Sequence, residues 1–68
     1  MNDINGIEIK DGDIVQYTII STILQTKYKD VYQFPATIFN GELCLKNNQG
    51  VCIPIYFFEK YNLKIISK

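Results

Sequence analysis

Residues 14–24 (IVQYTIISTIL) constrain the fold more strongly than any other stretch of the sequence. Most of them are β-branched, and such side chains lose rotamer freedom in a helix but pack well on a pleated sheet. The stretch therefore predicts the longest strand of the chain, with Val15, Tyr17 and Ile19 facing inward near its start. Because Ile19 and Ile20 interrupt the alternation, a bulge or bend at this pair is consistent with the pattern.

Turn-forming residues separate this strand from its neighbours. Residues 10–13 (KDGD) predict a turn before it, and the polar residues 25–30 predict an exposed loop after it. Residues 31–40 alternate and predict a second strand, in which Pro35 is confined to a sheet edge or a bulge because it lacks a backbone donor. Asn40-Gly41 is the strongest hairpin signal in the chain, since both residue types tolerate positive φ.

A third strand follows this hairpin signal directly. Residues 42–46 alternate, which places Leu43 and Leu45 inward and Cys44 outward. Residues 47–50 (NNQG) then predict a second tight turn, because its glycine stands where a left-handed backbone is needed.

The C-terminal part predicts a strand, a helical turn and a last strand. Residues 51–53 alternate as a half-buried strand, and Pro54 then removes a backbone donor that a central strand needs. Residues 56–61 are too few for a stable α-helix but suit a short 3₁₀ turn. Residues 63–66 predict the last short strand. Residues 4–10 predict a short N-terminal extension or entry strand ahead of the first turn.

The length of the chain allows a single domain over residues 1–68, and its 47% hydrophobic content argues against disorder. Five strands with short connections, and one helical turn before the last of them, suit a small closed barrel. Closure would also hide sheet edges. The predicted fold is therefore all-β: a five-stranded barrel with a short 3₁₀ turn before the last strand.

Three features together resemble an SH3-like barrel: Asp11-Gly12-Asp13 ahead of Ile14-Val15, the two tight turns, and Ile53-Pro54 followed by a helical turn. More narrowly, the chain is similar to small bacteriophage proteins of the YopX type, which pair such a first turn with a terminal apolar strand. The resemblance implies an SH3-like fold and an origin in a phage or mobile element. It implies no particular activity.

The composition lacks side chains that enzymes commonly use in catalysis. The chain has no His and no Arg, and its formal net charge is zero. Histidine is the commonest acid–base and metal-binding side chain. Turn and surface roles account for the carboxylates, as at Asp11 and Asp13, which flank a glycine and can cap backbone amides. The sequence therefore predicts a protein that is not an enzyme, with no metal and no cofactor.

The two cysteines, Cys44 and Cys52, fall almost opposite each other if the turn between them closes a hairpin, and both would then point outward. Two thiols without histidine are too few for a structural zinc site in one chain. Adjacent-strand disulfides are uncommon and often strained. Free thiols are therefore the favoured interpretation. A cross-strand disulfide and a metal shared within a dimer are the alternatives.

Aromatic side chains are more numerous than one small core requires: Phe39, Tyr56, Phe57, Phe58 and Tyr61. Exposed aromatics with a neutral charge balance are typical of a protein interface. We therefore expect a protein-interaction module that binds a partner or itself through these residues, with an edge strand available for strand addition. The alternative interpretation is that the aromatics cover the open ends of the barrel.

A nucleic-acid-binding barrel is the alternative function. Lys27-Tyr28-Lys29 and Tyr32 interleave basic and aromatic side chains, as single-strand nucleic-acid binders do. Against this function, the remaining lysines are spread along the chain and form no basic stripe. A solvated loop explains the same residues more simply.

The first residues show no basic segment followed by an apolar run, and no run is long enough to span a membrane. We therefore expect a cytoplasmic protein, with no membrane partner and with thiols that stay reduced.

Overall fold

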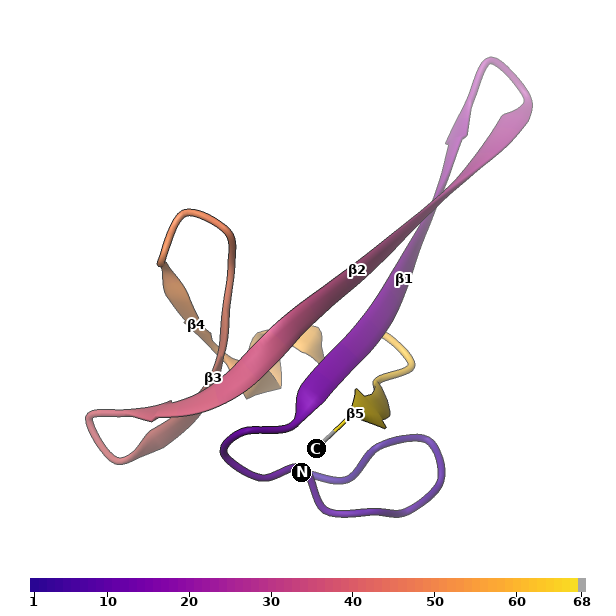
Figure 1. Cartoon of the computed structure of the whole chain (residues 1–68). Coiled ribbons are helices and arrows are strands. Elements are labelled where there is room, and N and C mark those ends of the chain that lie inside the picture. Colours follow the sequence, from indigo (N-terminus) through magenta and orange to yellow (C-terminus); the bar gives the residue numbers. More distant parts are fainter. Residues whose placement is uncertain (68) are drawn as a thin grey trace.

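The structure, a computed structural model, describes residues 1–67. Within these residues it contains five strands and one 3₁₀ turn (Figure 1). This order confirms the all-β prediction, the number of strands and the turn before the last strand. The bounds are β1 (Ile14–Ile23), β2 (Thr26–Phe39), β3 (Glu42–Lys46), β4 (Cys52–Pro54), η1 (Ile55–Phe58) and β5 (Lys64–Ser67).

The five strands form one antiparallel sheet in the order β4-β3-β2-β1-β5. β2 takes part in two ladders, because residues 26–35 pair with β1 and residues 36–39 pair with β3. Within the described part of the chain, no ladder joins β4 to β5. The sheet is therefore open, and the closure predicted for a barrel is not part of the observed pairing.

The ladder between β1 and β2 is regular from Ile14 opposite Pro35 to Ile23 opposite Thr26. No bulge therefore interrupts the pairing of β1 with β2 at Ile19 and Ile20, where the sequence pattern was consistent with a bulge or bend. Two adjacent isoleucines do not break the alternation here, because the first packs against the core and the second faces solvent. The irregularity of β1 lies instead at Ile14 and Val15, on the side that pairs with β5.

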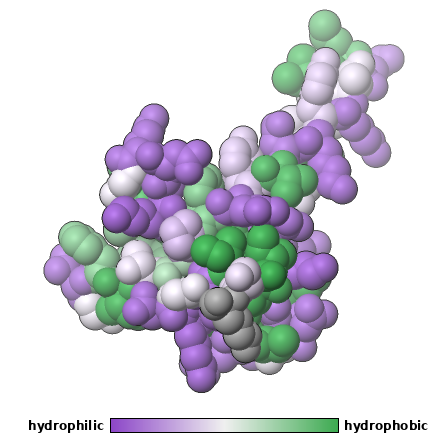
Figure 2. All heavy atoms as spheres, in the orientation of Figure 1, coloured by the Kyte–Doolittle hydropathy of each residue, from purple (hydrophilic) through white to green (hydrophobic). Residues whose placement is uncertain are grey.

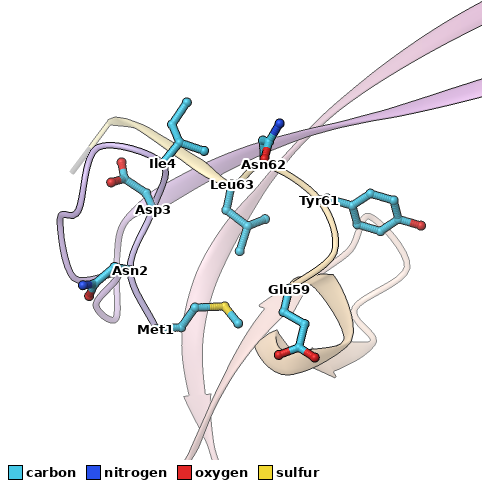
Figure 3. A pocket seen from close by; sticks show the side chains of 8 residues that line it. All are labelled: Met1, Asn2, Asp3, Ile4, Glu59, Tyr61, Asn62 and Leu63. Carbon is cyan, nitrogen blue, oxygen red and sulfur yellow. The ribbon is translucent and has the colours of Figure 1, made fainter.

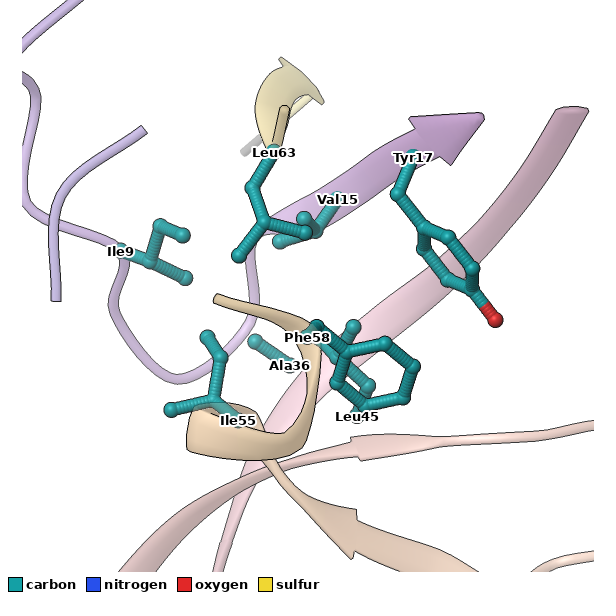
Figure 4. Packing of buried hydrophobic residues seen from close by; sticks show 8 residues of the cluster. All are labelled: Ile9, Val15, Tyr17, Ala36, Leu45, Ile55, Phe58 and Leu63. Atoms are coloured by element: carbon teal, nitrogen blue, oxygen red, sulfur yellow. The ribbon is translucent and has the colours of Figure 1, made fainter. Parts of the chain in front are cut away.

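The core lies where the inner faces of the strands meet η1 and the segment that follows it. Val15 and Tyr17 are buried and Ile19 packs beside them, as predicted. Burying one such apolar side chain contributes on the order of 1.5–3 kcal/mol, so this cluster contributes substantially to the stability of the sheet. The whole buried cluster is Ile9, Val15, Tyr17, Ala36, Leu45, Ile55, Phe58 and Leu63 (Figure 4).

The 3₁₀ turn η1 divides its side chains between core and solvent. A 3₁₀ helix has three residues per turn, so side chains at positions i and i+3 lie on the same side. Ile55 and Phe58 are accordingly buried, whereas Tyr56 and Phe57 are exposed. The turn begins one residue earlier than predicted and follows directly on Pro54, whose extended backbone ends β4.

The turn after β3 is held by a side-chain cap. The Oδ1 atom of Asn47 accepts hydrogen bonds from the N–H of Gln49 at 2.9 Å and of Val51 at 3.0 Å. The N–H of Gly50 donates to the Asn47 carbonyl at 3.0 Å, and Gly50 has a φ of 81°. The predicted tight turn at residues 47–50 is confirmed, with its glycine in the left-handed region as expected.

The N-terminal segment repeats the same construction and is tied to the last strand. The Oδ1 atom of Asp3 accepts from the N–H of Asn5 and of Ile7, both at 2.9 Å, and Gly6 has a φ of 79°. The Oδ2 atom of Asp3 accepts from the N–H of Ile65 at 3.2 Å. One carboxylate thus closes the first turn and joins it to β5. Figure 1 shows the N-terminal segment beside β5.

The cysteines depart from the prediction. Cys44 is buried although it lies outside the core cluster, and Thr37 and Pro54 flank it in register on the two neighbouring strands. Cys52 lies opposite Lys46, so the two thiols are offset by two residues and are not cross-strand partners. Both thiols are free, as the favoured interpretation predicted. Burial, with smaller effects of Cys52 and Glu42, raises the pKa of the Cys44 thiol, which keeps it in its less reactive form.

Candidate interaction surface

The outer half of the β1–β2 hairpin projects away from the body of the molecule (Figure 1). β5 pairs with β1 only as far as Gln16, and β3 pairs with β2 only from Ala36 onward. We call residues 18–31 the arm. Over the described chain, the arm is a two-stranded ribbon whose two outer edges have no neighbouring strand.

The arm corrects the predicted loop at residues 25–30. β2 begins at Thr26, and only Leu24 and Gln25 connect it to β1. Their φ angles are 51° and 65°, close to those of the turn residues Asn40 and Gly41 at 52° and 77°. Two-residue hairpins of this type favour Asn and Gly, because both positions need positive φ. The sequence offered this signal at the second turn and not at the first.

The tip of the arm presents a leucine to solvent. Leu24 is 94% exposed and Ile20, further back along β1, is 67% exposed. Ile23, Tyr28 and Val31 are also exposed large apolar side chains of the arm. Figure 2 shows apolar residues at the far end of the projection, beside hydrophilic ones. Large contiguous apolar patches on a protein surface often belong to interaction sites.

The register separates the side chains of the arm onto two faces. Successive side chains of a strand point to opposite faces, and cross-strand partners share a face. Lys27 lies opposite Thr22 and Lys29 lies opposite Ile20, which defines the lysine face. Tyr28 lies opposite Ser21 on the other face. We call this second face the tyrosine face; it continues the core face of the sheet.

The predicted nucleic-acid residues are therefore not brought together. Lys27 and Lys29 share the lysine face, whereas Tyr28 and Tyr32 belong to the tyrosine face. Tyr32 also stacks on Tyr17, with ring centroids 5.3 Å apart. A single strand that stacked its bases on the tyrosines would lie on the face opposite to both lysines.

The base of the arm is an aromatic cluster around Tyr17. Its ring centroid lies 4.9 Å from that of Phe58 and 5.5 Å from that of Tyr61, and Phe34 lies 6.1 Å away. Such contacts contribute about 0.5–1.5 kcal/mol per pair beyond the area that they bury. Burial, followed by the nearby Tyr32 and Tyr61, raises the pKa of the Tyr17 phenol. The cluster packs the base of the arm against η1 and the segment that follows it.

The aromatic residues predicted to bind a partner fall into two groups. Tyr56 and Phe57 are exposed and stack on each other with centroids 4.7 Å apart, and Phe39 is exposed at the end of β2. Phe58 is buried in the core, so the free chain does not expose it. Tyr61 is half-buried and packs against the core. The phase of the 3₁₀ turn explains this division.

A hollow of about 210 Å³ lies between the N-terminal segment and residues 59–63. Figure 3 shows its lining, in which the Tyr61 ring points away from Asp3. Pockets for small molecules usually measure about 300–1,000 Å³. The Asp3 carboxylate is already engaged by three backbone N–H donors. The hollow is therefore smaller than a usual ligand pocket, and one of its carboxylates is already hydrogen-bonded.

Neither a comparison with protein-family models nor searches of curated proteins and of solved structures find a match. Across residues 1–67, no helix has the length and apolar character to cross a membrane. In the same residues, no group of three or more His, Cys, Asp and Glu could hold a metal ion.

Proposed function

We propose that this chain is a non-enzymatic protein-interaction module whose binding element is the arm. The observation that carries the proposal is Leu24, a solvent-exposed leucine with positive φ at the tip of a projecting hairpin. Backbone strain of this kind costs on the order of 1–3 kcal/mol per residue and clusters at functional sites. A contact made by Leu24 in a complex would account for a residue that destabilises the free chain.

The architecture of the arm supports the same function. A two-stranded hairpin is marginally stable on its own in water, and both edges of this one are unpaired. An extended segment of a partner can add to such an edge through main-chain hydrogen bonds, while side-chain contacts provide specificity. The partner would be a foreign protein or a second copy of the chain.

A second surface of the same functional class is the exposed pair Tyr56 and Phe57 on η1, together with Phe39. These residues stay the predicted partner-binding aromatics. The arm ranks above them because it combines exposed apolar side chains with free backbone groups, whereas η1 is a single short turn packed on the core.

A photo-reactive amino acid at position 24 tests the proposal directly. We expect covalent adducts with a protein, because Leu24 would lie in the interface. The control places the same amino acid at Asn48, which is exposed on the turn after β3. Excess wild-type chain should suppress the adducts, and excess Leu24→Asn/Gln25→Gly chain should suppress them less. Equal labelling from positions 24 and 48, or no adduct at position 24, would contradict the proposal.

Binding of single-stranded nucleic acid is the weaker proposal, because Lys27 and Lys29 share a face from which Tyr28 and Tyr32 point away. It predicts that Lys27→Glu with Lys29→Glu weakens oligonucleotide binding and flattens its salt dependence. Weak, salt-insensitive binding of the wild type to every oligonucleotide would rule it out.

We further propose that the sheet is of the SH3-like type. Three features support this: the strand order, the sharing of β2 between two ladders, and the 3₁₀ turn that leads from β4 towards β5. Nuclear Overhauser contacts between the backbones of β4 and β5 would reveal closure into a barrel in solution, and their absence would exclude it.

A further inference from the structure

We infer that the outer edge of β1 within the arm pairs with the same edge of a second copy of this chain. The two arms then form one antiparallel, four-stranded sheet around a two-fold axis. This inference rests on the proposed function and names its partner.

The backbone hydrogen bonds at the start of the hairpin show which way each residue of β1 points. The N–H of Ala36 donates to the carbonyl of Asp13 at 2.8 Å, and the N–H of Gly12 donates to the Ala36 carbonyl at 2.9 Å. In an antiparallel ladder, hydrogen-bonded pairs alternate with non-hydrogen-bonded pairs. Because the register of β1 and β2 is unbroken, odd-numbered residues of β1 bond to β2 and even-numbered residues point outward.

The backbone groups of Thr18, Ile20 and Thr22 are therefore free on the outer edge of β1. The position of Ile65 supports this assignment independently. Ile65 lies opposite Val15, and its N–H donates to the Asp3 carboxylate. Beyond Gln16, β5 no longer covers the edge.

Edges elsewhere in the described sheet are protected. Proteins blunt exposed edges with charges, prolines, short strands or covering segments. The free edge of β2 carries Lys27 and Lys29, and β4 is three residues long and ends at Pro54. The N-terminal segment covers β5, since the Ile4 N–H donates to the Leu63 carbonyl at 2.8 Å. None of these devices is present on β1 in the arm.

The composition of that edge favours a second copy as its occupant. Residues 14–26 contain no charged side chain, and residues 18–23 (TIISTI) contain neither Gly nor Pro. Uncharged, β-branched segments of six residues are the type that pairs with copies of itself. Antiparallel pairing of two identical neutral strands opposes no like charges and closes as a dimer. A charged foreign peptide would find no complementary charge on this strand.

Two features determine the register between the two β1 strands of the dimer: the alternation of outward-pointing residues along β1, and the position of β5. In the dimer, the outward-pointing, even-numbered residues of one β1 strand must lie opposite even-numbered residues of the other. The two-fold axis therefore passes beside one residue of β1, which faces its own copy. A centre at Ile20 would place Leu24 of the second copy opposite Gln16, where Lys64 already lies. An axis nearer to the body would make the second copy overlap β5 further. The axis therefore lies closer to the tip of the arm than Ile20.

An axis at Ser21 avoids the overlap with β5. Ile20 of each copy then lies opposite Thr22 of the other. Ile19 then lies opposite Ile23 of the second copy on the tyrosine face, and such apolar cross-strand pairs are stabilising. The paired segment is short, so the dimer is weak and forms at high protein concentration.

Sedimentation over a concentration series, in reductant, tests this inference with two matched proline variants. The wild-type mass should rise from 7.9 kDa towards twice that value. Ile20→Pro removes an outward N–H from β1, and Lys29→Pro removes the outward N–H of its cross-strand partner on β2. We expect Ile20→Pro to weaken the dimer by about tenfold or more, equivalent to about 1.4 kcal/mol, and Lys29→Pro to dimerise like the wild type.

A second pair of variants decides the question if proline disrupts the hairpin, which circular dichroism would show. Ile20→Lys places a charge on the β1 edge, and Val31→Lys places one on the same face of β2. Loss of dimer in the first variant alone supports the inference. A wild type that stays at 7.9 kDa throughout, or a dimer lost only through the β2 variants, would overturn it. Adducts from position 24 to a foreign protein, with a monomeric wild type, would overturn the inference and leave the proposed function standing.

Discussion

At the scale of single residues, Tyr17 is the side chain on which the arm depends most. It is buried and contacts aromatic rings from β2, from η1 and from the segment after η1. Truncation of a buried aromatic to alanine costs about 3–5 kcal/mol, so Tyr17→Ala should unfold much of a domain this small. Its ring is what matters for packing, and Tyr17→Phe should change the free energy of unfolding by less than about 0.5 kcal/mol at neutral pH.

The hydroxyl of Tyr17 should affect the free energy of unfolding at alkaline pH. Its pKa in the folded chain is raised above the ordinary value of 10.0, chiefly by burial. The unfolded chain therefore releases this proton first, and the free energy of unfolding falls as the pH rises above 10.0. Tyr17→Phe should remove this part of the fall in urea titrations. The control Tyr28→Phe removes an exposed hydroxyl, and an identical slope in both variants would contradict the assignment.

Leu24 and Gln25 provide a test of strain at the same scale. Leu24→Asn with Gln25→Gly should stabilise the free chain by about 1 kcal/mol, because both new residues tolerate positive φ. The equivalent turn supplies the control: Asn40→Leu with Gly41→Gln should destabilise by a similar amount. Thermal unfolding measures both. A stabilised variant that also loses its partner would show that the strained leucine serves binding.

At the scale of elements, the sequence predicted those whose local signals agree with their packing. Asn40-Gly41 carries its own turn chemistry, so the β2–β3 hairpin was predicted correctly. The β1–β2 turn results from the pairing of two long strands. Leu24 and Gln25 are not typical turn residues, so the sequence does not predict a turn there. In η1, a shift of one residue in the start of the turn decides which of two adjacent phenylalanines is buried, and sequence alone does not fix that phase.

The N-terminal turn is the element most open to a pH test. The pKa of Asp3 is lowered, first by the hydrogen bond from the Ile7 N–H and then by those from Ile65 and Asn5 and by the charge of Lys64, while burial acts against them. A lowered folded pKa means that stability is present above the ordinary value of 3.8 and is lost as the pH falls through the folded pKa.

Asp3→Asn should therefore be less stable than the wild type near neutral pH, and the difference should shrink as the pH falls well below 3.8. Urea titrations at the two pH values measure the effect. The control Asp11→Asn changes an exposed carboxylate of the next turn and should have little effect. A constant difference at every pH would show that the charge of Asp3 is not what matters.

At the scale of the whole molecule, small size and an open sheet lead to the same expectation. A domain of about 60 residues buries only about 60% of the surface that its unfolded chain exposes, so added contacts matter. The sequence predicted surplus apolar groups and an edge available for strand addition. It did not place them on the arm, because the pairing of residues 25–30 with β1 was not visible. The register and the free edge come from the structure.

The most direct test of the pairing of two arms is a concentration series of backbone amide NMR spectra of the wild-type chain in reductant. We predict shifts and slowed exchange at Thr18, Ile20 and Thr22 as the concentration rises, with Tyr56 and Phe57 unchanged. Shifts confined to Tyr56, Phe57 and Phe39, or an arm whose amides do not respond at any concentration, would contradict the account.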